Sequence, residues 1–149
     1  MKQLITLSKK LLQSEGILYL IFGGLTTLVY MVTRLLLSAF AIDAGLSATI
    51  ANIISVLFAF ITNDTIVFRQ ERKGWLYRLG KFVLARLATA LIDIALAYLL
   101  VTRYPNLIGQ FVNNDYHLVN LIEMLFSQVL IILLNYVFSK VFVFKNTAN

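Results

Sequence analysis

The 149-residue chain is 60% hydrophobic and only 13% charged, carries a net charge of +6, and has a mean hydropathy of +0.83. These values lie far outside the range of a water-soluble domain and predict a protein that is embedded in the lipid bilayer. Because the chain contains no cysteine, disulfide bonds and thiol chemistry are excluded.

Four apolar stretches are each long enough to cross a bilayer, which takes about 20 residues. They cover residues 17–41, 46–67, 80–102 and 119–141. The first stretch is too long for the core of a signal peptide and is followed by no small-residue cleavage pattern, so we expect it to be retained. The pattern predicts an all-α integral membrane protein with four transmembrane helices and leaves no room for a separate soluble catalytic domain.

Basic residues gather at one side of the predicted helices. They are Lys2, Lys9 and Lys10 before the first helix, Arg69, Arg72, Lys73, Arg78 and Lys81 between the second and third, and Lys140 and Lys145 at the end of the fourth. The positive-inside rule then predicts a cell-membrane protein with both termini and the middle loop in the cytoplasm. Because these bases lie beside membrane ends, anionic lipid head groups are the expected counterpart, and nucleic acid is not.

Two similar helical hairpins follow one another along the chain. LTT at 25–27 matches LAT at 87–89 with an offset of 62 residues, and Val67-Phe68 matches Val143-Phe144 with an offset of 76. The difference of 14 residues falls in a longer loop between the third and fourth helices. Because each hairpin has two spans, both enter the membrane in the same direction, which predicts parallel repeats. The prediction is one domain over 1–149, with repeat one at about 17–68, a cytoplasmic basic loop at about 69–80 and repeat two at about 81–144.

Arg86 and Asp93 lie inside the third apolar stretch, where a charged residue costs roughly 2.5 to 3.5 kcal/mol at the centre of a helix. Arg86 is six residues into the predicted helix, which is about 9 Å from its cytoplasmic end. Asp93 follows two turns later on the same face. A guanidinium suits a phosphodiester, and a carboxylate suits sugar hydroxyls. The structural alternative is that they pair with neighbouring helices or with each other, although a separation of seven residues is too long for an easy direct pair.

Further polar residues lie where the second and fourth helices end. Asn63 and Asp64 close the second helix at about the depth at which Lys140 closes the fourth, and Asn135 extends this polar strip one turn into the membrane. A lipid phosphate lies at a similar depth, so these residues, together with Arg86, predict a head-group site. The structural interpretations are snorkelling for Lys140 and an interhelical hydrogen bond for Asn135.

Two charged residues lie nearer the outer side, Arg34 deep in the first helix and Glu123 early in the fourth. Their similar depths allow an ion pair, which we interpret first as structural. As a functional hypothesis, opening of this pair gates release of the sugar to the outer face. The single histidine, His117, lies in an outer loop without further ligands at metal-binding spacing, so neither a metal site nor a cofactor is expected.

Three motifs carry a family resemblance. FGGLTT in the first helix, FAFITNDTIVF at the end of the second and LLNYVFSKVFVF at the end of the fourth resemble the GtrA-like family of small four-helix membrane proteins. The resemblance covers about 19–145 and is closest to members linked to teichoic acid glycosylation. The chain departs from the family at Asp64 and Ile66, where the family often has a base and an aromatic residue, and Ser139 stands where the first copy has Asn63.

The resemblance implies that the protein handles a monosaccharide linked to a polyprenyl phosphate such as undecaprenyl phosphate. It implies flipping of this lipid from the inner to the outer leaflet, where a membrane glycosyltransferase adds the sugar to an envelope polysaccharide or teichoic acid. Four helices form a thin wall around so large a head group, which favours a homo-oligomer. The protein is not expected to be an enzyme, because no nucleophile, metal cluster or phosphate-cradling loop is visible.

Two other functions are compatible with the same features. The first is a non-transporting anchor or scaffold for a polyprenyl-phosphate glycosyltransferase, because GtrA-like segments resemble membrane domains that are fused to such enzymes. The second is a small multidrug exporter, which also has four helices and a membrane carboxylate. That class is expected to carry a glutamate in the first helix, where this chain has Arg34.

Overall fold

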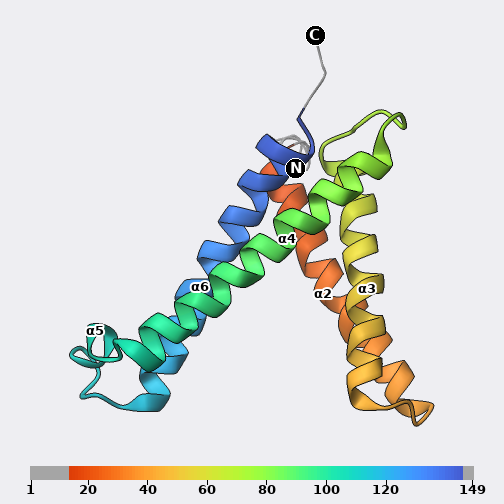
Figure 1. Ribbon diagram of the computed structural model, residues 1–149. Helices are drawn as coiled ribbons and strands as arrows, with labels where there is room; N and C mark the ends of the chain where they lie inside the picture. Colours follow the sequence, from red (N-terminus) through yellow and green to blue (C-terminus); the bar gives the residue numbers. More distant parts are fainter. Residues whose placement is uncertain (1–13, 146–149) are drawn as a thin grey trace, which may run out of the picture. The chain divides into compact units, whose positions relative to one another are not determined.

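The structure is a computed structural model that describes residues 14–145. Every regular element within these residues is helical, and four helical stretches are long and apolar enough to cross a membrane (Figure 1). They run over Glu15–Ala39, Ala44–Val67, Trp75–Arg103 and Tyr116–Val143. The prediction of an all-α, multi-pass membrane protein is therefore confirmed. Three of the basic residues used to predict orientation, Lys2, Lys9 and Lys10, lie outside the described residues.

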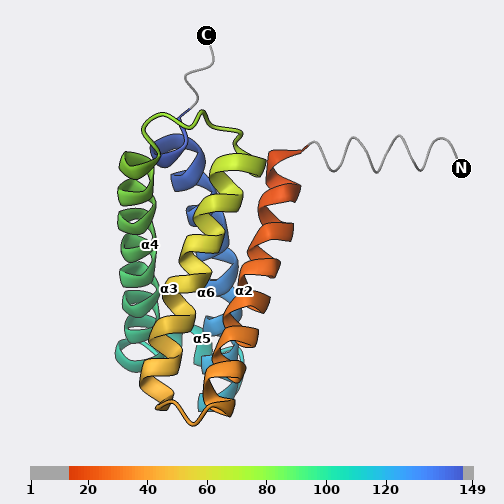
Figure 2. The ribbon, with the colours of Figure 1, turned by 90° about the vertical axis from the view of Figure 1, so that its right-hand side faces the viewer.

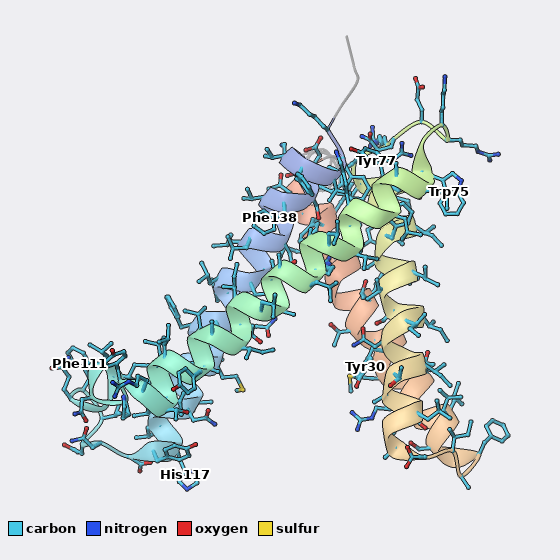
Figure 3. All side chains as sticks on the ribbon, in the orientation of Figure 1. Tyr30, Trp75, Tyr77, Phe111, His117 and Phe138 are labelled. Carbon is cyan, nitrogen blue, oxygen red and sulfur yellow. The ribbon has the colours of Figure 1, made fainter. Side chains whose placement is uncertain are left out.

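The largest difference from the predicted boundaries is at the start of the third span. The helix α4 (Trp75–Ala97) begins five residues before the predicted start at residue 80, so part of the predicted loop 69–80 is helical. Arg78 lowers the local hydropathy, but arginine is a good helix former and does not end a helix. Trp75 and Tyr77 are exposed at this end of α4 (Figure 3), as is typical of aromatic residues at a membrane–water interface.

The described residues divide into two compact units, 14–79 and 80–145. In the first unit, α2 (Glu15–Ala39) and α3 (Ala44–Thr62) run antiparallel and are in close contact (Figure 2). The helix α3 continues directly into η1 (Asn63–Val67), a π-helix that also contacts α2. The first unit is therefore a hairpin that includes the motif FAFITNDTIVF at the end of the second span.

A stripe of small side chains is buried along α3 at every fourth position. Its members are Ser47, Ala51, Ser55 and Ala59. Small residues allow a neighbouring backbone to approach closely, which is how helices gain van der Waals contact inside a bilayer. At the turn into α3, the Oδ1 atom of Asp43 accepts hydrogen bonds from the N–H groups of Gly45 at 2.9 Å and Leu46 at 3.1 Å. This cap satisfies two of the donors that a helix start leaves unpaired.

The second unit contains most of α4 and the remaining elements. After α4 come the π-helix η2 (Tyr98–Arg103), the short helix α5 (Asn106–Gly109), the long helix α6 (Tyr116–Phe138) and the π-helix η3 (Ser139–Val143). Among these elements, α6 contacts both η2 and α5. The helices α4 and α6 are linked by side chains that belong to the candidate site.

The longer loop predicted between the third and fourth spans contains α5 and ends at α6. Asn113 and Asn114 have positive φ angles of 53° and 56°, a conformation that asparagine tolerates better than most residues. Asp115 then caps α6 by accepting a hydrogen bond from the N–H of His117 at 2.9 Å. Phe111 is 80% exposed in this loop (Figure 3). An exposed aromatic residue just beyond the membrane spans fits an interfacial position.

Candidate functional site at the helix ends

The second and fourth spans both end in a π-helix of five residues. The segments η1 and η3 begin 76 residues apart, at Asn63 and Ser139, which is the offset predicted for the repeats. Each ends at a phenylalanine whose N–H bonds a carbonyl five residues back: Phe68 to Asn63 at 2.9 Å and Phe144 to Ser139 at 2.7 Å. π-helical turns often occur at functional sites. The sequence analysis did not predict these turns, and the equivalence of the two halves stays a prediction.

The segments η1 and η3 also bury residues at the same positions along the π-helix. The first residue, the last residue and the closing phenylalanine are buried in both: Asn63, Val67 and Phe68 in η1, and Ser139, Val143 and Phe144 in η3. They differ at the second residue, because Asp64 is buried whereas Lys140 is exposed. The shared backbone therefore carries different polar groups in the two segments.

Asn63 begins η1 and is only 3% exposed. Its Nδ2 atom donates a hydrogen bond to the carbonyl of Ala59 at 2.6 Å, whereas its Oδ1 atom is buried without a hydrogen-bond partner among the described residues. Leaving a buried acceptor unpaired costs about 1–3 kcal/mol. The Asn63 side chain thus offers an acceptor that a hydroxyl or amide donor of a ligand can satisfy.

Asp64, in contrast, is held by Arg78 within the first unit. The Nε atom of Arg78 lies 2.5 Å from Oδ1 of Asp64, and Nη2 lies 3.1 Å from Oδ2. The same guanidinium donates to the backbone carbonyls of Glu71 at 2.6 Å and Lys73 at 2.8 Å. This two-point pairing of guanidinium and carboxylate is the strong form of a salt bridge, and it ties η1 to the loop that follows.

The sequence analysis counted Arg78 only as a cytoplasmic charge and assigned Asp64 to the sugar. The structure gives both carboxylate oxygens of Asp64 a partner inside the protein. The sequence did contain a signal for this pair. Asp64 lies near the end of one helix and Arg78 in the first turn of the next, and only the loop 68–74 separates the two helices. Binding of the sugar by Asp64 stays a prediction, and it requires the ligand to compete with Arg78.

Arg86 is half-buried on α4 beside two buried aromatic rings. Its Cζ atom lies 4.8 Å from the ring centroid of Phe82, whose centroid lies 6.0 Å from that of Phe144. Because α4 begins at Trp75, Arg86 is eleven residues into the helix, which is roughly 16 Å from its start rather than the predicted 9 Å. The aromatic pair joins Arg86 to the closing phenylalanine of η3 through a cation–π contact.

Asp93, two turns beyond Arg86 on α4, is exposed. It forms no hydrogen bond or ion pair with any residue in the described part of the chain. A carboxylate in the middle of a membrane span is costly unless it meets a partner or water. Its position is thus compatible with the predicted role of binding sugar hydroxyls, and that role stays a prediction.

Asn135 links the two long helices of the second unit. The Oγ1 atom of Thr89 donates to Oδ1 of Asn135 at 2.9 Å and also lies 3.0 Å from the carbonyl oxygen of Arg86. Thr89 is 2% exposed and Asn135 is half-buried, so this hydrogen bond is partly buried. The structure therefore contains the interhelical hydrogen bond that we considered as the structural interpretation of Asn135. The sequence analysis missed Thr89, because a hydroxyl on a helix more often bonds its own backbone.

Lys140 is exposed on η3. Its Nζ atom lies 3.5 Å from the hydroxyl of Tyr136 and 5.8 Å from the centroid of the same ring. A lysine that lies along an aromatic side chain near the end of a span fits snorkelling toward the interface. Contact between Lys140 and a lipid phosphate stays a prediction.

Between α4 and the end of the fourth span lies an apolar groove with a volume of about 520 Å³. Its lining residues include Leu84, Ala85 and Ala88 from α4 and Phe138, Val141 and Phe142 from α6 and η3. Phe138 lies on α6 in the part of the unit where η3 begins (Figure 3). The sequence analysis did not predict the groove, although Ala85 and Ala88 are the small residues that leave room for it.

The two residues predicted to form an outer gate each have a partner within their own helix. Arg34 is exposed, and its Nη1 atom donates to the hydroxyl of Tyr30 at 3.1 Å. Glu123 is 4% exposed, and its Oε1 atom accepts a hydrogen bond from Ser127 at 2.6 Å. Arg34 and Glu123 belong to different units, so the ion pair between them stays a prediction.

Among residues 14–145 there is no group of three histidine, cysteine, aspartate or glutamate residues that could hold a metal ion. His117 is exposed at the start of α6, with its ring centroid 6.2 Å from that of Tyr116 (Figure 3). The first unit thus contributes polar groups at the end of α3 and η1, and the second unit contributes polar groups together with an apolar groove.

The fold and these helix ends define a multi-pass helical membrane protein with polar residues near the ends of its spans. The chain belongs to the GtrA/DPMS transmembrane domain family, which matches residues 18–144. This match confirms the resemblance carried by the three sequence motifs.

Similar proteins occur in species of Listeria and Bacillus. The cell wall teichoic acid glycosylation protein GtcA of Listeria monocytogenes is 34% identical over 132 residues, covering 86% of this chain and 83% of that protein. The protein of the same name from Listeria innocua is 32% identical over 133 residues, covering 87% and 83%. The uncharacterized membrane protein YwcD of Bacillus subtilis is 32% identical over 134 residues, covering 87% and 96%. No solved structure matches the chain significantly.

Proposed function

We propose that the protein flips a polyprenyl-phosphate-linked monosaccharide from the inner to the outer leaflet of the cell membrane. The sugar then serves glycosylation of a cell-wall polymer such as teichoic acid. Membership of the GtrA/DPMS family supports this proposal, as do the relatives whose names refer to cell wall teichoic acid glycosylation. The four candidate membrane spans and the polar residues within them are compatible with it.

The proposal rests on two hydrogen-bond acceptors within the spans. Neither acceptor has a donor among the described residues. Oδ1 of Asn63 is buried and unpaired, and Asp93 is exposed in the middle of the span Trp75–Arg103. Acceptors inside hydrocarbon are costly unless a partner supplies hydrogen bonds. A monosaccharide is rich in hydroxyl donors. It therefore complements these two positions better than a hydrophobic or cationic drug does.

Arg86 is the proposed partner of the phosphodiester. A guanidinium forms two parallel hydrogen bonds with phosphate oxygens, and it stays charged even when it is partly buried. The ring of Phe82 supports the guanidinium at 4.8 Å, so part of the cost of ordering the side chain is already met. In this mechanism the phosphate binds at Arg86 and sugar hydroxyls bind at Asp93, and Asn63 is a further acceptor for hydroxyls in the first unit.

The membrane potential favours movement in the proposed direction. With the predicted orientation, a monoanionic phosphodiester that moves outward is driven by the inside-negative potential, which contributes about 2.3 kcal/mol per 100 mV. The sequence contains no phosphate-cradling loop for ATP, so we propose that the cycle runs without nucleotide hydrolysis. The expected transport partner is a membrane glycosyltransferase that consumes the flipped lipid on the outer face.

The test is leaflet exchange in liposomes that contain a short-chain polyprenyl-phosphate monosaccharide. An impermeant sugar-oxidising reagent reports the fraction of the lipid in the outer leaflet over time. We expect wild-type protein to accelerate exchange and Arg86→Ala to reduce the accelerated rate by about a hundredfold, the loss given by one buried charge-assisted phosphate contact. Arg72→Ala, which removes an exposed base in the loop, is the matched control and should exchange like wild type.

The scaffold function is the main alternative outcome of this experiment. If wild-type protein exchanges several lipid-linked sugars no faster than protein-free liposomes, transport is wrong and a glycosyltransferase anchor becomes the better account. If Arg86→Ala is folded, as judged by helical circular dichroism, and exchanges like wild type, the phosphate role of Arg86 is wrong. A small multidrug exporter would instead accelerate movement of lipophilic cations, which the same liposomes can report.

A further inference from the structure

A cation, Lys81, lies near the apolar groove of the second unit. On α4, Lys81, Leu84, Ala85 and Ala88 follow the i, i+3, i+4, i+7 spacing that places residues on one helical face. The Nζ atom of Lys81 lies 5.1 Å from the ring centroid of Phe142, which lines the groove. Seven residues of helix, about 10 Å, separate Lys81 from Ala88. The groove thus runs along α4 from a positive charge into a hydrocarbon-lined hollow.

The groove has room for a hydrocarbon chain. Its volume of about 520 Å³ falls within the range of small-molecule pockets, roughly 300–1,000 Å³. Alanines form the α4 side, whereas Phe138 and Phe142 present aromatic surfaces from α6 and η3. Leu84 and Val141 are 61% and 64% exposed, so the groove is open for entry along its length. A single hydrocarbon chain can therefore enter sideways and lie against the rings.

We propose that this groove binds the phosphate-proximal isoprene units of a polyprenyl phosphate, with the phosphate beside Lys81 before it moves to Arg86. This inference rests on the proposed function for its choice of lipid. A polyprenyl phosphate has one anionic group, which can pair with Lys81, and one branched chain, which can enter the groove. A phospholipid such as phosphatidylglycerol has two acyl chains instead. The predicted orientation places Lys81 toward the cytoplasm, where the phosphate of an inner-leaflet lipid lies.

The groove orients the lipid but contributes little to the free energy of binding. In a bilayer the surrounding lipid tails are as apolar as the groove, so no hydrophobic gain accompanies entry, and only van der Waals contact and charge remain. Recognition must then come mainly from Lys81 and from the fit of the chain. A lipid held in this way keeps its phosphodiester within reach of α4 when the sugar moves, whereas a tail left in bulk lipid does not.

The test is photo-crosslinking of the full chain in phosphatidylcholine nanodiscs with a prenyl phosphate that carries a diazirine on its first isoprene units. Crosslinked residues are mapped by mass spectrometry. We expect the crosslinks to concentrate on Leu84, Ala88 and Val141. We also expect Lys81→Gln to lower their yield by about tenfold, as the loss of one charge-assisted hydrogen bond implies. Lys145→Gln makes the same charge change away from the groove and should leave the yield unchanged.

A matched pair of volume changes tests the hollow itself. Ala88→Leu fills the groove, whereas Ala90→Leu adds the same volume at an exposed position on α4. We expect Ala88→Leu to abolish groove crosslinking and Ala90→Leu to preserve it. Lys81→Arg keeps the charge and should restore the yield lost in Lys81→Gln, which separates a role in binding from a defect in folding.

Competition identifies the lipid. Unlabelled undecaprenyl phosphate should displace the probe, whereas undecaprenol and phosphatidylglycerol at the same mole fraction should not. Equal displacement by phosphatidylglycerol, or crosslinks spread evenly over α4, would overturn the inference. Leaflet exchange in liposomes is measured independently of crosslinking. Exchange without crosslinks in the groove would refute lipid binding in the groove but not flipping. Crosslinks in the groove without exchange would refute flipping but not lipid binding.

Discussion

The segments η1 and η3 close the second and fourth spans with the same backbone and with different chemistry. Each is a π-helix of five residues that ends at a buried phenylalanine. In η1, a buried asparagine keeps an unpaired oxygen and the next residue, Asp64, is locked by Arg78. In η3, the corresponding positions are a buried serine and the exposed Lys140.

This comparison separates architecture from function. The shared hydrogen bonds and buried apolar positions explain how both spans end, since the same Val-Phe pair is buried in each. The polar residues explain what each end can bind, and they differ in charge and in exposure. We propose unequal roles for the two ends, with a hydroxyl-binding acceptor in η1 of the first unit and phosphate- and tail-binding residues in the second unit.

The largest expected effect comes from breaking the ion pair between Asp64 and Arg78, which involves η1 and not η3. Arg78→Ala leaves the buried carboxylate of Asp64 without its partner, and we expect the free energy of unfolding to fall by about 3 kcal/mol or more. Steric trapping of the unfolded protein in bicelles measures this free energy of unfolding. The double variant with Asp64→Asn removes the stranded charge and should recover part of the loss. A loss below about 1 kcal/mol for Arg78→Ala would show that the pair behaves as an exposed one.

A smaller effect compares two threonines, Thr27 and Thr89, that the predicted repeats place at equivalent positions. Thr89→Val removes the partly buried hydrogen bond to Asn135, and we expect a loss of about 0.6 kcal/mol in the free energy of unfolding, the average for such bonds in membranes. Thr27→Val, whose hydroxyl is exposed and bonds the carbonyl of Gly23 in its own helix at 3.3 Å, should change the free energy of unfolding by less. A double-mutant cycle with Asn135→Leu isolates the pair, and a coupling of zero would contradict the assignment.

The smallest effect concerns the exposed base of η3. Lys140→Gln should leave the free energy of unfolding nearly unchanged and slow leaflet exchange by about threefold, because an exposed ionic contact contributes at most about 1 kcal/mol. Liposome exchange and thermal melting of the same sample measure the two quantities. A complete loss of exchange with normal folding would mean that η3 holds the phosphate as strongly as Arg86 does.

Much of the fold could be predicted from the sequence because membrane spans are a local property. An apolar stretch of sufficient length is recognisable without knowledge of its neighbours, and all four predicted spans are helical. The start of α4 was predicted five residues late, since hydropathy falls at the bases of the interface whereas the helical hydrogen bonds continue.

The candidate site was harder to predict because it depends on contacts between segments distant in the chain. Arg78 was expected to be one charge among several, yet it pairs with a residue 14 positions earlier. Thr89 and Asn135 are 46 positions apart. The π-helical turns depend on a hydrogen-bond register that no residue type specifies alone. Sequence reasoning thus placed the polar residues at the correct ends of the helices without identifying their partners.

The most direct test of the account is leaflet exchange of a polyprenyl-phosphate monosaccharide with wild type, Asn63→Leu and Ser139→Ala reconstituted at equal amounts. The account predicts acceleration by wild type, a fall of about tenfold or more in Asn63→Leu from the lost sugar hydrogen bond, and little change in Ser139→Ala. Wild-type exchange no faster than that of protein-free liposomes would contradict the flippase function. Equal rates for the two variants would contradict the unequal roles of η1 and η3.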